Sequence, residues 1–169
     1  MPDMKDKISA WANHPNRRTY KQGVVFQPGK EVSSEYFNLW MGFAVEPVEG
    51  ANTDIIKKHI EEIICTNDSA LIEYFYDWIA YTMQYPHKPA GTALVLRGEK
   101  GTGKGTIGHF LRRIWGPHAK HISNPNHLIG QFNSHLMDAC FLFADEAFYS
   151  GDKKNEGVLK ALITEPTVM

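Results

Sequence analysis

A glycine-rich loop with one lysine is the part of this sequence whose residue types and spacing most clearly suggest chemistry. Gly98 is followed, after four residues, by Gly103 and Lys104, which is the spacing of the Walker A motif. Glycines in that motif let backbone N–H groups curl around phosphate oxygens, and the lysine reaches the β and γ oxygens. The sequence therefore predicts a phosphate-binding loop, with contacts from Gly98, Glu99, Lys100, Gly101, Thr102, Gly103, Lys104, Gly105 and Thr106.

The position after the lysine departs from this motif. A Ser or Thr hydroxyl normally stands there as a ligand of Mg²⁺, but this chain has Gly105 and then Thr106. One helical step turns a side chain by about 100°, so Thr106 replaces the hydroxyl only if the helix start is rotated or the metal ion sits differently. Thr106 is a candidate metal ligand on that condition. A glycine-rich turn without any ligand is the alternative interpretation of the loop.

Two adjacent carboxylates are the candidate second half of the site. Asp145 and Glu146 end the apolar run 139–144, which is the pattern of a buried strand that delivers them to the carboxyl edge of a parallel sheet. Asp145 would hold Mg²⁺ through its water shell, and Glu146 would polarise the water that attacks a γ-phosphate. Alone, such a run could be a strand that ends at solvent. Because this run lies downstream of the glycine-rich loop, the two together predict a Walker B motif and nucleotide hydrolysis. Lys104 and Glu146 are the predicted catalytic residues.

The elements that must position these residues are predicted from hydrophobic spacing. Residues 92–96 are apolar and β-favouring, which indicates a buried parallel strand before the loop. After the loop, apolar residues recur at helical spacing from Ile107 to Ile114, so a helix begins near Lys104 and directs the positive end of its dipole at the site. We expect a further strand at 119–123 and partial helix at 125–136.

Upstream of the loop, two further parts are predicted. Residues 1–50 contain short strands around a Pro-Gly turn, and residues 51–90 form a helical hairpin. Thr53 would cap its first helix, and Asn67 or Asp68 its second. Residues 91–169 then form the third part, an α/β core with a parallel sheet and a P-loop.

Composition limits the remaining possibilities. Hydrophobic residues at 43% and charged residues at 22% are globular values, and a net charge of −1 means that any contact with nucleic acid must be local. Cys65 and Cys140 lie in apolar contexts and are predicted to be reduced core residues, which fits a reducing cytoplasm. The amino end shows neither a signal peptide nor a membrane span. The spacings of the four histidines at 118, 121, 127 and 135 match no compact metal site.

Two groups of cations could make local DNA contacts. Lys153, Lys154 and Lys160 follow the carboxylates, and a cluster of basic and aromatic residues occupies 17–21. A solvated charged surface is the alternative for both groups.

With these motifs in view, the chain resembles the superfamily 3 helicases of phages and plasmids, in particular the helicase part of phage-type primase-helicases. The matching segments are 94–106, 131–136, 143–147 and 159–164. The resemblance implies an AAA+-type ATPase that assembles as a homo-hexamer and moves along single-stranded DNA. It also implies ATP and Mg²⁺ as ligands, a possible primase domain or partner, and the host cytoplasm as the location. In such helicases a residue other than Ser or Thr often follows the lysine, and Lys153, Lys154 and Lys160 correspond to a basic element in the DNA channel.

The family also has a later strand that ends in a polar sensor residue, and an arginine that reaches the neighbouring subunit's ATP. The sequence ends before either. In AAA+-type sheets the sensor strand lies between the strands of the two Walker motifs, so we expect an incomplete sheet. We also expect that this chain is a piece of a longer protein and, alone, neither hydrolyses ATP efficiently nor unwinds DNA.

The sequence leaves three functions open. The first is the ATP-driven motor of a replicative primase-helicase. The second is another P-loop ATPase, of the packaging or loader type, which would not need single-stranded DNA for turnover. The third is a protein that only binds nucleotide, which Gly105 favours and the two carboxylates oppose.

Overall fold

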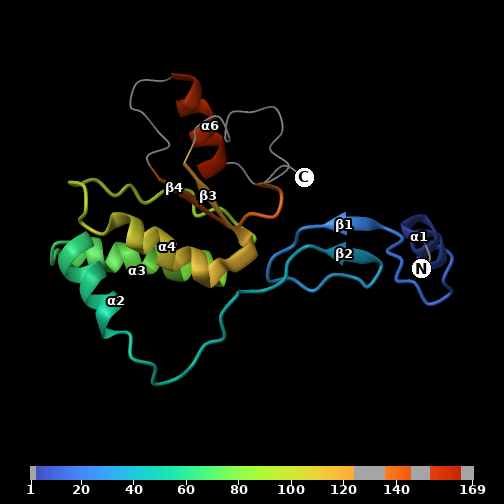
Figure 1. The fold of residues 1–169 in the computed structure, drawn as a ribbon. Helices are drawn as coiled ribbons and strands as arrows, with labels where there is room; N and C mark the ends of the chain where they lie inside the picture. Colours follow the sequence, from blue (N-terminus) through green and yellow to red (C-terminus); the bar gives the residue numbers. More distant parts are fainter. Residues whose placement is uncertain (1–2, 124–135, 146–152, 165–169) are drawn as a thin grey trace.

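A computed structural model of the chain describes residues 3–123, 136–145 and 153–164 (Figure 1). The fold is mixed α/β, with two separate parallel strand pairs and several helices. Within the described residues, no helix is long and apolar enough to cross a membrane.

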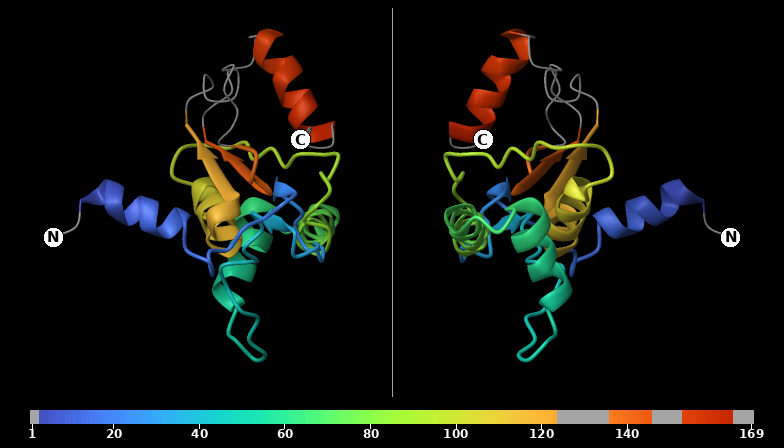
Figure 2. Two further views of the ribbon diagram at one scale, coloured as in Figure 1. Left: turned by 90° about the vertical axis from the view of Figure 1, so that its right-hand side faces the viewer. Right: turned by 90° about the vertical axis from the view of Figure 1, so that its left-hand side faces the viewer.

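The first fifty residues contain a helix that the sequence patterns did not indicate. Helix α1 (Met4–Ala12) is closed at its start by a capping box between Asp3 and Asp6. In the sequence, the capping box is marked only by two aspartates three residues apart, which is a weaker pattern than Ser or Thr followed three residues later by Glu. Figure 2 shows α1 projecting away from the rest of the chain.

The predicted short strands are present as β1 (Gly23–Val25) and β2 (Tyr36–Asn38). They pair in parallel, with Gly23 opposite Tyr36, so the Pro-Gly turn between them does not close a hairpin. Gly29, in that turn, has a φ of 66° and packs against the ring of Pro86. This contact brings the amino-terminal segment to the end of the helical hairpin.

The helical hairpin begins with α2 (Asp54–Lys58), which continues directly into a π-helix, η1 (His59–Ile64). Thr53 occupies the N-cap position, but its side chain makes no capping bond, and Asn52 Oδ1 accepts the Asp54 N–H instead. Helix α3 (Ser69–Gln84) follows, and Asp68 caps it by accepting from the N–H groups of Ala70 and Leu71. The predicted cap of α3 is therefore confirmed as Asp68. Thr53 has the predicted N-cap position of α2, but the prediction that its side chain accepts the capping bond was wrong.

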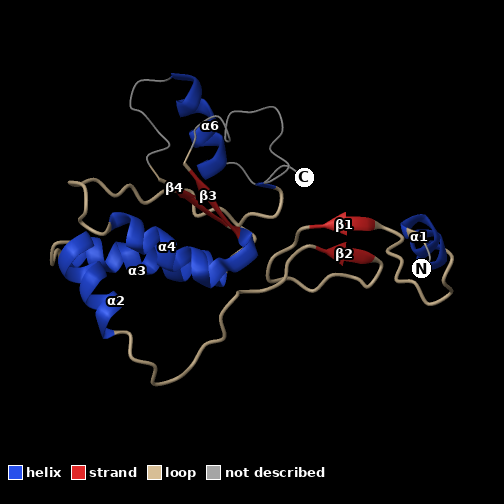
Figure 3. Ribbon diagram, in the orientation of Figure 1, coloured by secondary structure: helices blue, strands red, loops and turns tan. Residues whose placement is uncertain are grey.

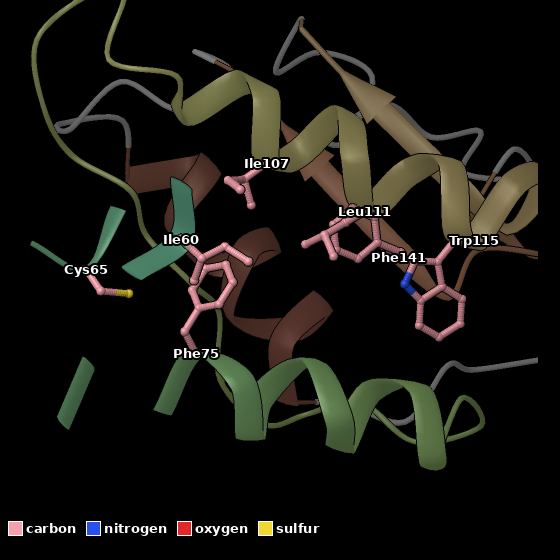
Figure 4. Close-up of a cluster of buried hydrophobic side chains, with 7 residues drawn as sticks. All are labelled: Ile60, Cys65, Phe75, Ile107, Leu111, Trp115 and Phe141. Carbon is pink, nitrogen blue, oxygen red and sulfur yellow. The ribbon is translucent and has the colours of Figure 1, made fainter. Parts of the chain in front are cut away.

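The core lies where α3, η1 and α4 (Lys104–Trp115) meet (Figure 4). Helix α4 begins at the predicted lysine and ends at Trp115, with Gly116 as its C-cap. It is followed by a short 3₁₀ turn, η2 (Gly116–His118), and by β3 (Ala119–Ile122), as expected. The buried members of the main core are Ile60, Cys65, Phe75, Ile107, Leu111, Trp115 and Phe141.

Strand β4 (Phe141–Ala144) lies parallel to β3 in register, with Ala119 opposite Phe141 and Ile122 opposite Ala144. Helix α4 packs on this pair at Gly108, where an added Cβ would overlap the ring of Phe143. Glycine in the middle of α4 therefore lets the helix approach the strand closely. Helix α6 (Lys153–Thr164) is the last described element. The helix predicted in 125–136 falls almost wholly outside the described residues.

The strand predicted at residues 92–96 is not formed. Figure 3 draws the whole stretch between α3 and α4 as loop. Leu94 and Leu96 pack against the core, whereas Val95 is 87% exposed, so the segment alternates as a strand would. A strand also needs a hydrogen-bonded neighbour, and β4 is paired only with β3 in the part of the chain that the structure describes.

Candidate functional site

The glycine-rich loop adopts a conformation that depends on two of its glycines. Gly101 has a φ of 85° and Gly103 has a φ of 81°, both in the left-handed region that side chains disfavour. Gly103 is also the N-cap of α4 and has no side chain to bond the first N–H groups of the helix. The start of α4 is thus a helix terminus suited to an anion.

Lys104 holds the loop around its own ammonium group. Lys104 Nζ donates to the carbonyl oxygens of Gly98 at 2.9 Å and Glu99 at 2.5 Å, and to Thr102 Oγ1 at 3.0 Å. Thr102 Oγ1 in turn donates to the Glu99 carbonyl. An ammonium group has three N–H donors, so the loop supplies an acceptor for each. A bound phosphate would have to take over some of these bonds.

The positions predicted to supply a hydroxyl differ in their surroundings. A Cβ built on Gly105 meets nothing within 4 Å, so a side chain would have room there. Thr106 is exposed, and its N–H donates to the Gly103 carbonyl at 3.0 Å. Its role as a metal ligand stays a prediction.

Asp145 follows β4 directly, at the end of the strand where the sequence predicts a carboxylate. Its N–H donates to the carbonyl of Ile122, which continues the pairing of the two strands by one residue. Its carboxylate is 47% exposed and lies 3.9 Å from His121 Nε2. No hydrogen bond or ion pair joins Asp145 to Lys104 among the described residues, and Glu146 lies outside them. The joining of the two predicted halves of the site therefore stays a prediction.

His59 touches the loop and was not predicted to do so. Its Nε2 lies 3.1 Å from the carbonyl oxygen of Gly103, which it reaches from the π-helix η1. From the sequence, His59 is interpreted as a packing or surface residue, because no residue near it offers the spacing of a metal site.

His118 has a hydrogen-bond partner on each of its two ring nitrogens. His118 is 1% exposed, accepts the Met41 N–H at Nε2 and donates to the Asp138 carbonyl at Nδ1. These bonds fix its neutral tautomer and leave no nitrogen for a metal. Among the described residues, no group of three or more His, Cys, Asp or Glu could hold a metal ion.

Cations gather in two places. Lys153, Lys154 and Lys160 all lie on α6, and Lys160 is exposed. A cavity of about 290 Å³ on α4 is lined by His109, Arg112 and Arg113.

The two cysteines are thiols. Burial raises the pKa of Cys140 to about 12, with a further contribution from Asp138. Burial also raises the pKa of Cys65, with smaller effects from Asp68 and Glu61. Because the thiolate is the nucleophile and the metal ligand, neither residue is suited to those roles.

Comparisons with known proteins find a similarity to one phage protein and a match to one family model. A family described only as a family of unknown function, DUF5906, matches residues 96–169. The DNA primase-polymerase of Nitratiruptor phage NrS-1 is 27% identical over 154 residues, which are 85% of this chain and 21% of that protein.

The apo structure of the NrS-1 C-terminal region (305–718) superposes with a TM-score of 0.68 and 26% identity. That match covers 84% of this chain and 36% of the NrS-1 structure. This chain is homologous to part of the carboxyl-terminal region of a phage primase-polymerase. It spans about one fifth of that relative's length.

Proposed function

We propose that this chain carries the nucleotide-binding site of an ATP-hydrolysing motor in a phage replication protein of the primase-helicase type. The observation that carries the proposal is the loop around Lys104, whose left-handed glycines lead into the uncapped start of α4. This geometry suits a triphosphate because it offers one cation and a helix N-terminus at the same place.

The residues that would act on ATP and Mg²⁺ are those that the motifs predict. Lys104 would exchange its bonds to loop carbonyls for bonds to the β and γ phosphates. Asp145 is suited to the metal's water shell because its carboxylate is half-exposed and has no ion-pair partner closer than His121 among the described residues. Bound Mg²⁺ would neutralise charge on the phosphates. Thr106 would supply a hydroxyl, and Glu146 would orient the attacking water.

Single-stranded DNA is the proposed track of the motor. The homology to a primase-polymerase supports a role in DNA replication, and the lysines of α6 follow the carboxylates as the helicase resemblance requires. We further propose a homo-hexamer in the full-length protein, acting in the host cytoplasm.

The segment 92–96 has no hydrogen-bonded strand beside it among the described residues. Its alternating burial is that of a strand, and β4 is paired along only one edge within the described residues. A sensor strand inserted between them would give both segments a partner. A longer chain, of the length of its relatives, is therefore the form in which we expect efficient hydrolysis.

A nucleotide-binding protein without turnover is the second candidate. Gly105 favours it, since the usual hydroxyl next to the lysine is absent. A packaging or loader ATPase would share the same residues but would not depend on single-stranded DNA.

ATP hydrolysis by the longer chain, with and without single-stranded DNA, separates these candidates. The proposed motor predicts a rate that DNA raises and that Lys104→Ala or Glu146→Gln abolishes. Hydrolysis at a rate that DNA does not change favours the packaging or loader type, and nucleotide binding with no hydrolysis in any condition favours a protein that only binds nucleotide.

A further inference from the structure

The contact between His59 and Gly103 joins the helical hairpin to the glycine-rich loop. His59 Nε2 donates to the Gly103 carbonyl oxygen at 3.1 Å. The imidazole also fills the space beside Gly103, because a Cβ added there would overlap His59 Cε1 and lie 2.8 Å from Nε2. The hydrogen bond and the close packing are separate observations that connect the same two residues.

The π-helix fixes the position of His59. The next residue, Ile60, is buried in the core beside Phe75 and Ile107 (Figure 4). The Cys65 N–H bonds to the Ile60 carbonyl, which closes the wide turn of η1. Single π-helical turns occur often at functional sites. His59 therefore stands on an element that the core anchors.

The bond acts on the peptide unit that begins α4. A trans peptide is planar, so its C=O and N–H point in opposite directions. The unit that carries the Gly103 carbonyl also carries the Lys104 N–H. The same carbonyl also accepts the Thr106 N–H at 3.0 Å. Together, this helical bond and the His59 bond hold the direction of the Lys104 N–H, which is the first of the helix N-terminus where a phosphate would bind.

We propose that His59 is a positioning residue for the phosphates of a nucleoside triphosphate. It holds the Gly103–Lys104 peptide in the orientation that binds them, and so couples the helical hairpin to nucleotide binding. This inference rests on the proposed function, since it concerns the same loop.

Three substitutions separate the hydrogen bond from packing. His59→Leu keeps about the volume of the ring without the donor, His59→Ala removes both, and His59→Gln retains an N–H donor at similar reach. His87→Ala is the matched control, because His87 is an exposed histidine beyond α3. Thermal denaturation of each variant shows whether it is folded.

The probe is the equilibrium binding of a fluorescent ATP analogue with Mg²⁺ to the 169-residue chain. A hydrogen bond contributes about 0.5–1.5 kcal/mol, so His59→Leu and His59→Ala should weaken binding roughly two- to tenfold. His59→Gln and His87→Ala should bind as the unchanged chain does. Unaltered binding by a folded His59→Leu variant would overturn the proposal.

Amide hydrogen exchange at residues 101–104 tests His59 independently of nucleotide. The proposal predicts faster exchange of these amides in His59→Leu than in His59→Gln. If the unchanged chain binds no nucleotide, the proposed function fails, and this exchange measurement still decides whether His59 orders the loop. Equal exchange in both variants would show that it does not.

Discussion

The two sides of the glycine-rich loop are held in different ways. After the loop, α4 is fixed by buried residues, with Ile107 2% exposed and Trp115 1% exposed. Before the loop, residues 92–96 touch the core with alternate side chains, but their backbone pairs with no strand among the described residues. A helix makes its hydrogen bonds within itself, whereas a strand depends on a neighbour. The comparison teaches that the downstream side of the loop is held by a helix with its own hydrogen bonds, whereas the upstream side is held by side-chain contacts.

Truncating one side chain on each side of the loop gives the largest expected contrast. Ile107→Ala should destabilise the chain by about 2–5 kcal/mol, because it leaves a cavity in the core. Val95→Ala should change the free energy of unfolding by less than about 0.5 kcal/mol, because Val95 is exposed. Chemical denaturation measures both. A large loss from Val95→Ala would mean that residues 92–96 are a buried strand after all.

A substitution at the close approach of α4 to β4 should cause a smaller loss of stability. Gly108→Ala should cost about 1–3 kcal/mol, since the new methyl group overlaps the Phe143 ring. The same substitution should cost less in a Phe143→Leu background, which makes room for the methyl group. Equal costs in both backgrounds would show that the helix and strand do not meet at this point.

The smallest expected effect lies at the junction of the loop and α4, and it is an increase in stability. Gly105→Ala should stabilise the chain by about 0.5–1 kcal/mol, because alanine is the better helix former and the site is open. Gly103→Ala is the control and should destabilise the chain, because the backbone of Gly103 is in the left-handed region and the residue lies against His59. Thermal denaturation compares the two, and a loss of stability in Gly105→Ala would contradict the open space beside this glycine.

The sequence was most informative where structure is local. The start of α4 at Lys104, the Asp68 cap of α3 and the strands at 119–122 and 141–144 follow from nearby residues, and the structure has all of them. The strand at 92–96 was wrong because an apolar, β-favouring run does not show whether a hydrogen-bonded neighbour is present. Helix α1 was missed because its capping box uses two aspartates.

The site itself was predictable only in part. The glycines and Lys104 carry a spacing that identifies the motif, but their mutual hydrogen bonds do not follow from any pattern. His59 reaches Gly103 through a tertiary contact that depends on a π-helical turn. No periodicity in the sequence indicates such a turn, and for that reason the residue was not connected to the loop.

The most direct test of the account is whether this loop binds a triphosphate through Lys104. Isothermal titration of Mg²⁺ and ATP into the 169-residue chain, and into Lys104→Ala, measures it. Hydrogen bonds from a charged group contribute about 1.5–3 kcal/mol, so we predict binding that is roughly 10- to 150-fold weaker in Lys104→Ala. Equal affinity in the two proteins, or no binding by the unchanged chain, would contradict the central claim.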